Sequence, residues 1–279
     1  MSNEIDGRLA ALVPAEAGGS VYEVLALRYA TRVSTRAQCF LGGERGGEGD
    51  APLRMDYFLW LLRCAERTIV IDTGFASSAG ARRGRECLVD PAAALSLAGV
   101  QPLAVEQVVI THLHYDHVGN IGAFPRASLH VHGRELDFWL RPRTEDEPSD
   151  PLVEPTELAA VEQAVRAGRV RRIENDAQIA PGVLALWTGG HTPGQMIVVA
   201  SGSRSTVVLA SDALHFYEEL DGGVSFAVRS DERELQHGYD LLRELAARGA
   251  TIVAGHDPAV LDRFPRLPGS LAELGVRVG

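Results

Sequence analysis

Four potential metal ligands lie within six consecutive residues of this chain, in the run His-Leu-His-Tyr-Asp-His at residues 112–117. Imidazole nitrogen and carboxylate oxygen are ligand types that zinc prefers. Alternate residues of an extended loop point the same way, so His112 and His114 can bind one metal ion. Asp116 and His117 are then left for a second ion. The competing interpretation, a surface loop that is merely rich in histidine, is disfavoured by this density of ligands.

The residues around this cluster predict where it lies. An apolar run from Val105 to Ile110 is typical of a buried strand that ends at Thr111. Gly119 and Asn120 follow, as expected where a loop leads into the next element. The cluster is therefore expected at the C-terminal end of a strand, where α/β proteins keep their chemistry.

Further potential ligands follow later apolar runs one at a time. His191 comes shortly after the run 183–187, Asp212 directly after 207–211, and His256 directly after 251–255. A single histidine or aspartate at a strand end more often caps a turn than binds a metal. Together with the first cluster, however, these residues predict ligands that converge on one edge of the sheets.

The elements that would position these residues follow from apolar periodicity and from turn and cap signals. Expected strands cover residues 21–30, 54–63, 67–72, 105–110, 128–132, 183–187, 195–200, 205–210 and 251–254. Expected helices cover 90–99, with Asp90 as N-cap and Pro91 in the first position, and then 133–140, 156–167 and 231–248. Strands in hairpin-like groups alternate with helices, which predicts an α/β sandwich of two mixed sheets with helices on the outer faces.

Composition sets the broad class. With 279 residues, of which 46% are hydrophobic and 23% charged, the chain can bury a large core, and we expect a single domain over residues 1–279. Residues 1–20 are expected to be a loosely ordered lead-in, and residues 45–50 a flexible glycine-rich loop. The net charge of −10 disfavours nucleic acid as a partner. Residues 1–19 contain no continuous apolar stretch of signal-peptide length, and no run approaches ~20 apolar residues, so we expect a cytoplasmic protein without a membrane span.

The three cysteines, Cys39, Cys64 and Cys87, are scattered and show no Cys-x-x-Cys spacing. This pattern supports neither a disulfide framework nor a cysteine zinc site. We expect Cys64 to be a small buried hydrophobic residue.

The ordered motifs of the chain resemble those of the metallo-β-lactamase fold superfamily. The matching segments lie between residues 54 and 258 and comprise 68–74, 112–117, 189–194, 211–213 and 255–257. This resemblance implies a four-layer αβ/βα sandwich with two divalent metal ions. One ion would be held by His112, His114 and His191, the other by Asp116, His117 and His256, and Asp212 would bridge them. Asp72 would either brace the histidine loop or simply form a turn.

Within the superfamily, the chain is most similar to the N-acyl-homoserine lactonases. The similarity rests on the aromatic Tyr115 before Asp116, on Asp-Thr-Gly-Phe at 72–75, and on Gly-His-Asp at 255–257. Those lactonases often carry a tyrosine three residues after the bridging aspartate, whereas this chain has His215 there and Tyr217 two residues later. Zinc β-lactamases usually have a cysteine in place of Asp212, so the resemblance argues against that activity.

The function that the resemblance implies is a dinuclear-metal hydrolase. It would open the ring of an N-acyl-homoserine lactone or a similar lactone by attack of a metal-bridging hydroxide. Another ester, a thioester of the glyoxalase II type, or an organophosphate stays open as the substrate class. Zinc suits the ligands best, although iron, manganese or cobalt would also bind. The expected partner is a small-molecule lactone or ester, and the sequence allows a homodimer.

Three residues are candidates for catalysis beyond metal binding. Asp116 would be a ligand alone or would also pass a proton to the leaving oxygen. Tyr115 would either project toward the substrate or pack under the loop. His215 would donate a hydrogen bond or proton near the reacting carbonyl. Alternatively, His215 would be structural and Tyr217 would be the donor. Residues 134–155 are expected to form a flap whose Phe138 and Trp139 either line an apolar pocket or pack into the core.

Overall fold

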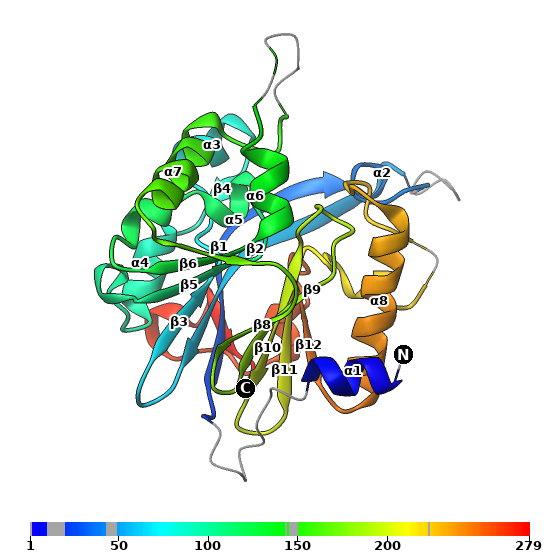
Figure 1. Cartoon of the computed structure of the whole chain (residues 1–279). Helices are drawn as coiled ribbons and strands as arrows, with labels where there is room; N and C mark the ends of the chain where they lie inside the picture. The colour runs from blue at the N-terminus through cyan, green and yellow to red at the C-terminus, as the bar shows by residue number, and fades with distance from the viewer. Residues whose placement is uncertain (1, 10–19, 43–48, 143, 145–149, 223) are drawn as a thin grey trace.

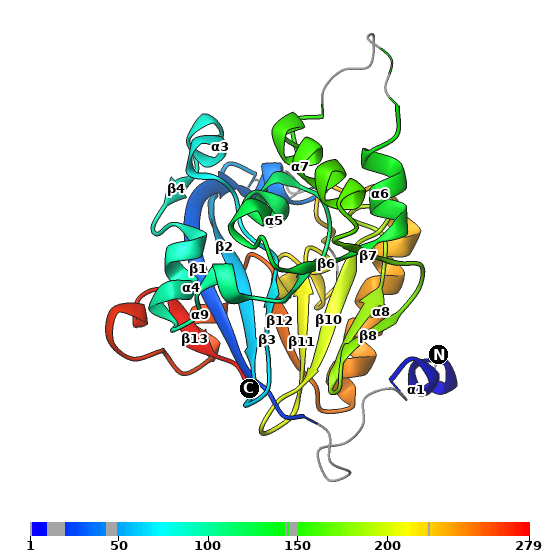
Figure 2. The same cartoon turned by 60° about the vertical axis from the view of Figure 1, so that its left-hand side comes forward.

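The computed structural model describes residues 2–9, 20–42, 49–142, 144, 150–222 and 224–279 (Figure 1). Two β-sheets face each other, and helices cover the outer side of each (Figures 1 and 2). This is the αβ/βα sandwich expected from the sequence. The expected glycine-rich loop at 45–50 and the centre of the expected flap lie largely outside the described residues.

The first sheet has the strand order β13-β1-β2-β3-β5-β6-β7, with β4 paired to the outer part of β1. Its N-terminal strands are antiparallel, whereas β3, β5, β6 and β7 are parallel. The bounds are β1 Glu23–Thr35, β2 Pro52–Arg63, β3 Thr68–Ile71, β4 Glu86–Cys87, β5 Gln107–Ile110, β6 Ser128–His132, β7 Val170–Ile173 and β13 Gly275–Arg277.

The second sheet has the order β12-β11-β10-β9-β8 and is antiparallel except between β11 and β12. Its strands are β8 Ala177–Ala180, β9 Val183–Trp187, β10 Met196–Ser201, β11 Thr206–Ser211 and β12 Thr251–Ala254. The parallel pair brings the C-terminal ends of β11 and β12 to one edge, and Asp212 and His256 follow those ends.

The main core lies between the sheets, and a second apolar layer lies between the first sheet and its helices. Alternate residues of β2 divide between them: Phe58, Trp60 and Leu62 face the second sheet, while Tyr57, Leu59 and Leu61 face the helices. Because β2 is buried on both faces, its sequence is a nearly continuous apolar run. Each such side chain contributes about 1.5–3 kcal/mol by leaving water.

Most of the described helices cover the first sheet, and α8 covers the second (Figure 1). Asp90 caps α4 by accepting from the N–H groups of Ala92 and Ala93, as expected from the sequence. The bounds are α1 Ser2–Leu9, α2 Arg36–Cys39, α3 Ser77–Arg82, α4 Pro91–Leu97, α5 Tyr115–Val118, α6 Gly133–Trp139, α7 Pro155–Arg166, α8 Glu232–Ala247 and α9 Val260–Arg263, with 3-10 turns η2 Pro102–Ala104, η3 Ile121–Ala123, η4 Tyr217–Glu219 and η5 Gly269–Leu271. None of the helices among the described residues has the length and hydrophobicity needed to cross a membrane.

Within the expected lead-in, residues 2–9 form α1, and Arg8 of α1 binds the Asp176 carboxylate at 2.6 Å and the Trp187 carbonyl at 2.6 Å, whereas residues 10–19 lie outside the described residues. One local prediction was wrong. The histidine cluster is not an extended loop to its end, because the one-turn helix α5 begins at Tyr115. His114 is the N-cap residue of this helix, so Asp116 and His117 have helical rather than extended geometry, and the His117 ring lies 4.1 Å from that of His112.

A buried carboxyl in α7 gives a pH-dependent prediction for stability. Glu157 is 7% exposed, and its Oε2 has no hydrogen-bond partner. Burial, together with the nearby carboxylates of Glu154 and Asp116, raises the pKa of Glu157 to about 8 against the opposing charges of Arg83 and Arg82. The folded state then binds more protons than the unfolded state between the ordinary pKa and about 8, so this residue costs stability as the pH rises through that window.

Glu157→Gln is therefore expected to raise the free energy of unfolding at pH 9 and to change it little at pH 5. Urea denaturation of both proteins at the two pH values measures the difference. An equal effect at both pH values would mean that the charge of Glu157 is not the cause.

Candidate metal centre

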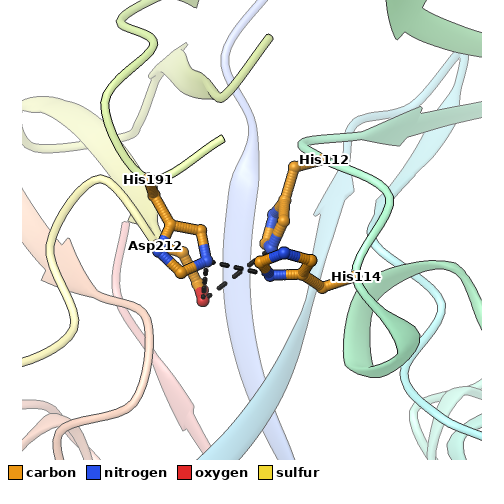
Figure 3. Close-up of side chains that lie close together, drawn as sticks. All are labelled: His112, His114, His191 and Asp212. Carbon is orange, nitrogen blue, oxygen red and sulfur yellow. Dashed lines mark hydrogen bonds and ion pairs between the residues drawn. The ribbon is translucent and has the colours of Figure 1, made fainter. Parts of the chain in front are cut away.

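The seven ligands expected from the sequence lie together in two buried groups. The ligand atoms within each group are within 4.8 Å of one another. The first group contains His112, His114, His191 and Asp212, and the second contains Asp116, His117 and His256. Figure 3 shows the first group, in which two histidines from the loop after β5 face His191 and Asp212 from the second sheet.

Asp212 reaches both groups with its two carboxylate oxygens. Its Oδ2 lies 3.3 Å from Nε2 of His191 and 3.8 Å from Nε2 of His112. Its Oδ1 lies 3.1 Å from Nε2 of both His117 and His256. This geometry suits a carboxylate that bridges two cations.

The donors of this cluster fit metal ions. The buried Nε2 atom of His112 has no hydrogen-bond partner among the described residues. A buried polar atom without a partner is costly, and a bound cation would satisfy this nitrogen. Burial lowers the pKa of His112 and His191 well below its ordinary value and that of His114 to about 4. These imidazoles are therefore neutral near pH 7, which is the form that binds a metal.

His117 behaves differently because carboxylates surround it. Burial alone would lower its pKa, but the carboxylates of Asp212, Asp72 and Asp116 raise it well above the ordinary value. The surrounding carboxylates thus stabilise positive charge beside His117, and a divalent cation bound by the second group would supply that charge.

Residues behind the ligands fix their orientation. Asp72 places Oδ2 2.7 Å from Nδ1 of His117 and accepts from the Thr111 N–H and hydroxyl groups at 2.8 Å each. His191 Nδ1 lies 2.9 Å from the Val228 carbonyl oxygen, and His256 Nδ1 lies 2.8 Å from that of Asp56. Such contacts set the tautomer and leave Nε2 free for a metal.

The backbone at two strand ends is strained next to these ligands. Asp72 has φ of 60° and Ser211 has φ of 47°, both in the left-handed region that non-glycine residues rarely adopt. Such a conformation costs about 1–3 kcal/mol and persists only where the surroundings impose it. Here the Thr111 hydroxyl joins the two positions, since it lies 2.8 Å from Ser211 Oγ and donates to Asp72. Asp72 is thus both a strand-end residue and a contact of His117.

Sequence reasoning missed Glu135, which connects two ligand loops. Its carboxylate is fully buried and accepts from the N–H groups of Leu113 at 2.9 Å and Gly194 at 2.8 Å, and from the indole N–H of Trp139 at 2.9 Å. Leu113 lies between two ligands, and Gly194 lies three residues after His191. The one sequence signal was a Glu–Trp pair four residues apart on the helix at 133–140.

His215 lies against the centre. Its Nε2 is 3.1 Å from Oδ2 of Asp212, and its ring stacks on Phe226 with centroids 3.4 Å apart. Burial alone would lower the pKa of His215, but the Asp212 carboxylate raises it to about 9. Tyr217, the other candidate for this part, instead donates its hydroxyl to the Ile252 carbonyl oxygen at 3.1 Å and does not line the cavity.

The Tyr115 side chain packs against neighbouring residues and also lines the cavity beside the metal centre. It is 2% exposed, its ring stacks on Phe75, and its hydroxyl accepts from Nε of Arg85 at 3.0 Å. It nevertheless lines a cavity of about 460 Å³ together with Asp116, Asp212 and His215. The two interpretations of Tyr115 therefore do not exclude each other.

The aromatic pair of the expected flap lies apart from this cavity. Trp139 is buried in the core between the first sheet and its helices, where its ring is 5.7 Å from that of His114. Phe138 is 40% exposed. Neither lines the cavity over the metal centre, so the packing interpretation fits Trp139.

Comparison with known proteins agrees with this geometry. The family model described as the metallo-beta-lactamase superfamily matches residues 57–256. The N-acyl homoserine lactonase of Bacillus thuringiensis is 27% identical over 220 residues, which cover 74% of this chain and 82% of the lactonase.

Solved structures show the same fold. An N-acyl homoserine lactone hydrolase with N-hexanoyl-L-homoserine bound at its catalytic metal centre superposes with a TM-score of 0.71 at 22% identity, covering 90% of this chain and 99% of that one. AidC, a dizinc quorum-quenching lactonase, superposes with a TM-score of 0.64 at 19% identity, covering 86% and 91%. With the ordered ligand motifs and the two-sheet sandwich, these matches mean that the chain belongs to the metallo-beta-lactamase superfamily and is a metal-dependent hydrolase.

Proposed function

We propose that this protein hydrolyses lactones at a centre of two divalent metal ions, with N-acyl-homoserine lactones or related lactones as substrates and zinc as the metal that suits the ligands best. The observation that carries the proposal is Asp212, whose two oxygens face two separate groups of buried ligands beside a cavity. Relatives and structural neighbours named as lactonases support the substrate class.

Several residues of the chain would each have a separate role in the reaction. Two bound ions would lower the pKa of water toward neutrality and polarise the substrate carbonyl. Asp212 would fix the distance between the two groups of ligands. Asp116, at the edge of the cavity, would hold a proton and pass it to the leaving alkoxide. His215 would donate a hydrogen bond to the reacting carbonyl oxygen, while the apolar ring of Phe226 shields its other face.

A substrate panel tests this proposal. Purified protein loaded with zinc, manganese, cobalt or iron(II) would be assayed on N-acyl-homoserine lactones of several chain lengths and on simple γ-lactones. Aryl esters, a glutathione thioester and an organophosphate would be assayed in parallel. We expect the highest kcat/KM on a lactone and two metal ions per chain by elemental analysis. A thioester or an organophosphate hydrolysed faster than every lactone would overturn the proposed substrate class.

The role of His215 leads to a separate prediction. His215→Ala is expected to lower kcat by about 10²–10⁴-fold, the usual contribution of a positioned general acid. Both ions should stay bound, because none of the seven proposed ligands is removed. Tyr217→Phe is the matched control and should behave like the wild type, since that hydroxyl is engaged with Ile252. Loss of metal from the alanine variant would make His215 part of the scaffold instead.

A further inference from the structure

Two arginines line the cavity beside the metal centre and have no carboxylate partner among the described residues. The β1–β4 ladder pairs Ala30 with Cys87 and Thr31 with Glu86, and Arg32 and Arg85 are the next residues of the two segments at the end of this ladder. Both side chains line the cavity that contains Asp116 and Asp212. Both charges also act on the same phenol, because each lowers the pKa of Tyr57 against the raising effect of burial.

The third arginine of this cavity is paired. Arg83, which also lines it, binds Glu154. In the described part of the chain, by contrast, no ion pair reaches either Arg32 or Arg85. Nε of Arg32 is buried and has no hydrogen-bond partner. Among the described residues, Arg85 donates to two neutral acceptors, the Tyr115 hydroxyl and the Arg83 carbonyl oxygen.

This arrangement is unfavourable without a ligand. Two like charges at the end of one short ladder repel each other and destabilise the pairing of the two segments. The cavity itself offers two carboxylates, Asp116 and Asp212, and both belong to the proposed metal groups, where divalent cations would offset them. The chain as a whole carries a net charge of −10, so the positive charge at this cavity is local. Such a cavity concentrates anions and raises their rate of entry.

We propose that Arg32 and Arg85 bind a carboxylate of the substrate that is remote from the bond being hydrolysed. The preferred substrates would then be lactones or esters that carry a negative charge on the acyl chain or the ring. Guanidinium groups suit this task because their planar N–H groups match the two oxygens of a carboxylate. Apolar side chains of Val33, Met55 and Phe226 in the same wall would contact the carbon chain between the two ends. This inference rests on the proposed function, because the proposed lactone hydrolysis supplies the substrate class. Its test also includes esters and thioesters, so the two proposals can fail separately.

The test uses pairs of substrates that differ only in charge. Metal-loaded enzyme would be assayed on lactones whose acyl chain ends in a carboxylate and on the same lactones ending in a methyl ester or a primary amide. Matched aryl esters and thioesters would be assayed alongside. We expect kcat/KM to be at least tenfold higher for the charged member of the pair. This ratio should fall as salt is raised from 20 mM to 500 mM, because salt screens the interaction.

Arg32→Gln is the decisive variant, because Arg85 also holds the Tyr115 hydroxyl. It is expected to reduce the ratio of charged to neutral substrate by about tenfold or more. Its melting temperature without substrate should be equal to or above that of the wild type, because a like-charge contact is removed. Arg126→Gln, which removes one exposed positive charge away from the cavity, should leave the ratio unchanged.

The outcomes of these assays distinguish a failure of the carboxylate site from a failure of the proposed function. A wild-type ratio near one on lactones that are hydrolysed would overturn the carboxylate site and leave the proposed function standing. Lactones that are not hydrolysed, with charged esters or thioesters preferred over neutral ones, would overturn the proposed function and support the carboxylate site. An unchanged ratio in Arg32→Gln, or an equal loss on both members of a pair, would also overturn the carboxylate site. Preference for a charged product as inhibitor, without preference among substrates, would assign the arginines to product binding and contradict the proposal.

Discussion

Asp212→Ala is expected to abolish the paired arrangement of metal ions and to lower kcat/KM by roughly 10³-fold or more. The physical reason is that both carboxylate oxygens are engaged, one with each group of ligands. Metal catalysis is worth several kcal/mol of transition-state stabilisation, and about 4 kcal/mol corresponds to roughly a thousandfold in rate. The loss should exceed that from removing an outer ligand such as His112 or His256, since each of these serves one group only.

The measurement combines elemental analysis with steady-state kinetics on the best substrate of the panel. Asp212→Asn keeps one oxygen of the side chain and should retain more metal than the alanine variant. Asp221→Ala, which removes an exposed aspartate outside the centre, is the matched control. Two tightly held ions and near wild-type activity in Asp212→Ala would show that the bridge is not needed.

Glu135→Ala is expected to loosen two ligand loops at once. It leaves the N–H groups of Leu113, Gly194 and Trp139 without their acceptor. Each buried donor left unpaired costs about 1–3 kcal/mol, so we expect the three lost contacts to lower the free energy of unfolding by about 3 kcal/mol or more. Metal affinity should fall about 10–100-fold, as is typical when a partner behind the ligands is lost.

Trp139→Phe separates the two effects. It removes one donor to Glu135 but keeps both backbone contacts, so it should cost stability and leave metal affinity near that of the wild type. Competition with a chromophoric chelator measures the affinity, and urea denaturation measures stability. Wild-type metal affinity in Glu135→Ala would restrict this carboxylate to a role in stability.

Elements with strong local signals were predictable from the sequence. The continuous apolar run of β2 reflects burial on both faces, and the Asp90–Pro91 pair marks the start of α4. The four-residue strand β7, Val-Arg-Arg-Ile, was not predicted, because it is an edge strand with two exposed arginines and carries no apolar period. The one-turn helix α5 was missed because its first residue follows a histidine that gives no side-chain cap.

The residues of the candidate site also differ in how far the sequence predicts them. The proposed metal ligands were predictable because they follow apolar runs, and the end of a strand fixes where the next residue lies. Glu135 could not, because its partners lie 22 and 59 residues away in the sequence. The placement of Arg32 and Arg85 in one cavity depends on the two-residue ladder between β1 and β4, and no local pattern specifies that register.

The two groups of ligands draw on both sheets of the sandwich. His112 and its neighbours follow β5 of the first sheet, whereas His191, Asp212 and His256 follow β9, β11 and β12 of the second. Ions held there would cross-link the two halves of the fold, and their binding free energy would add to the free energy of unfolding. A free metal concentration of 100 times the dissociation constant adds about 2.7 kcal/mol per site. The stability of this protein is then a function of the metal supply rather than a fixed property, and a metal-starved cell would hold a less stable enzyme as well as a less active one.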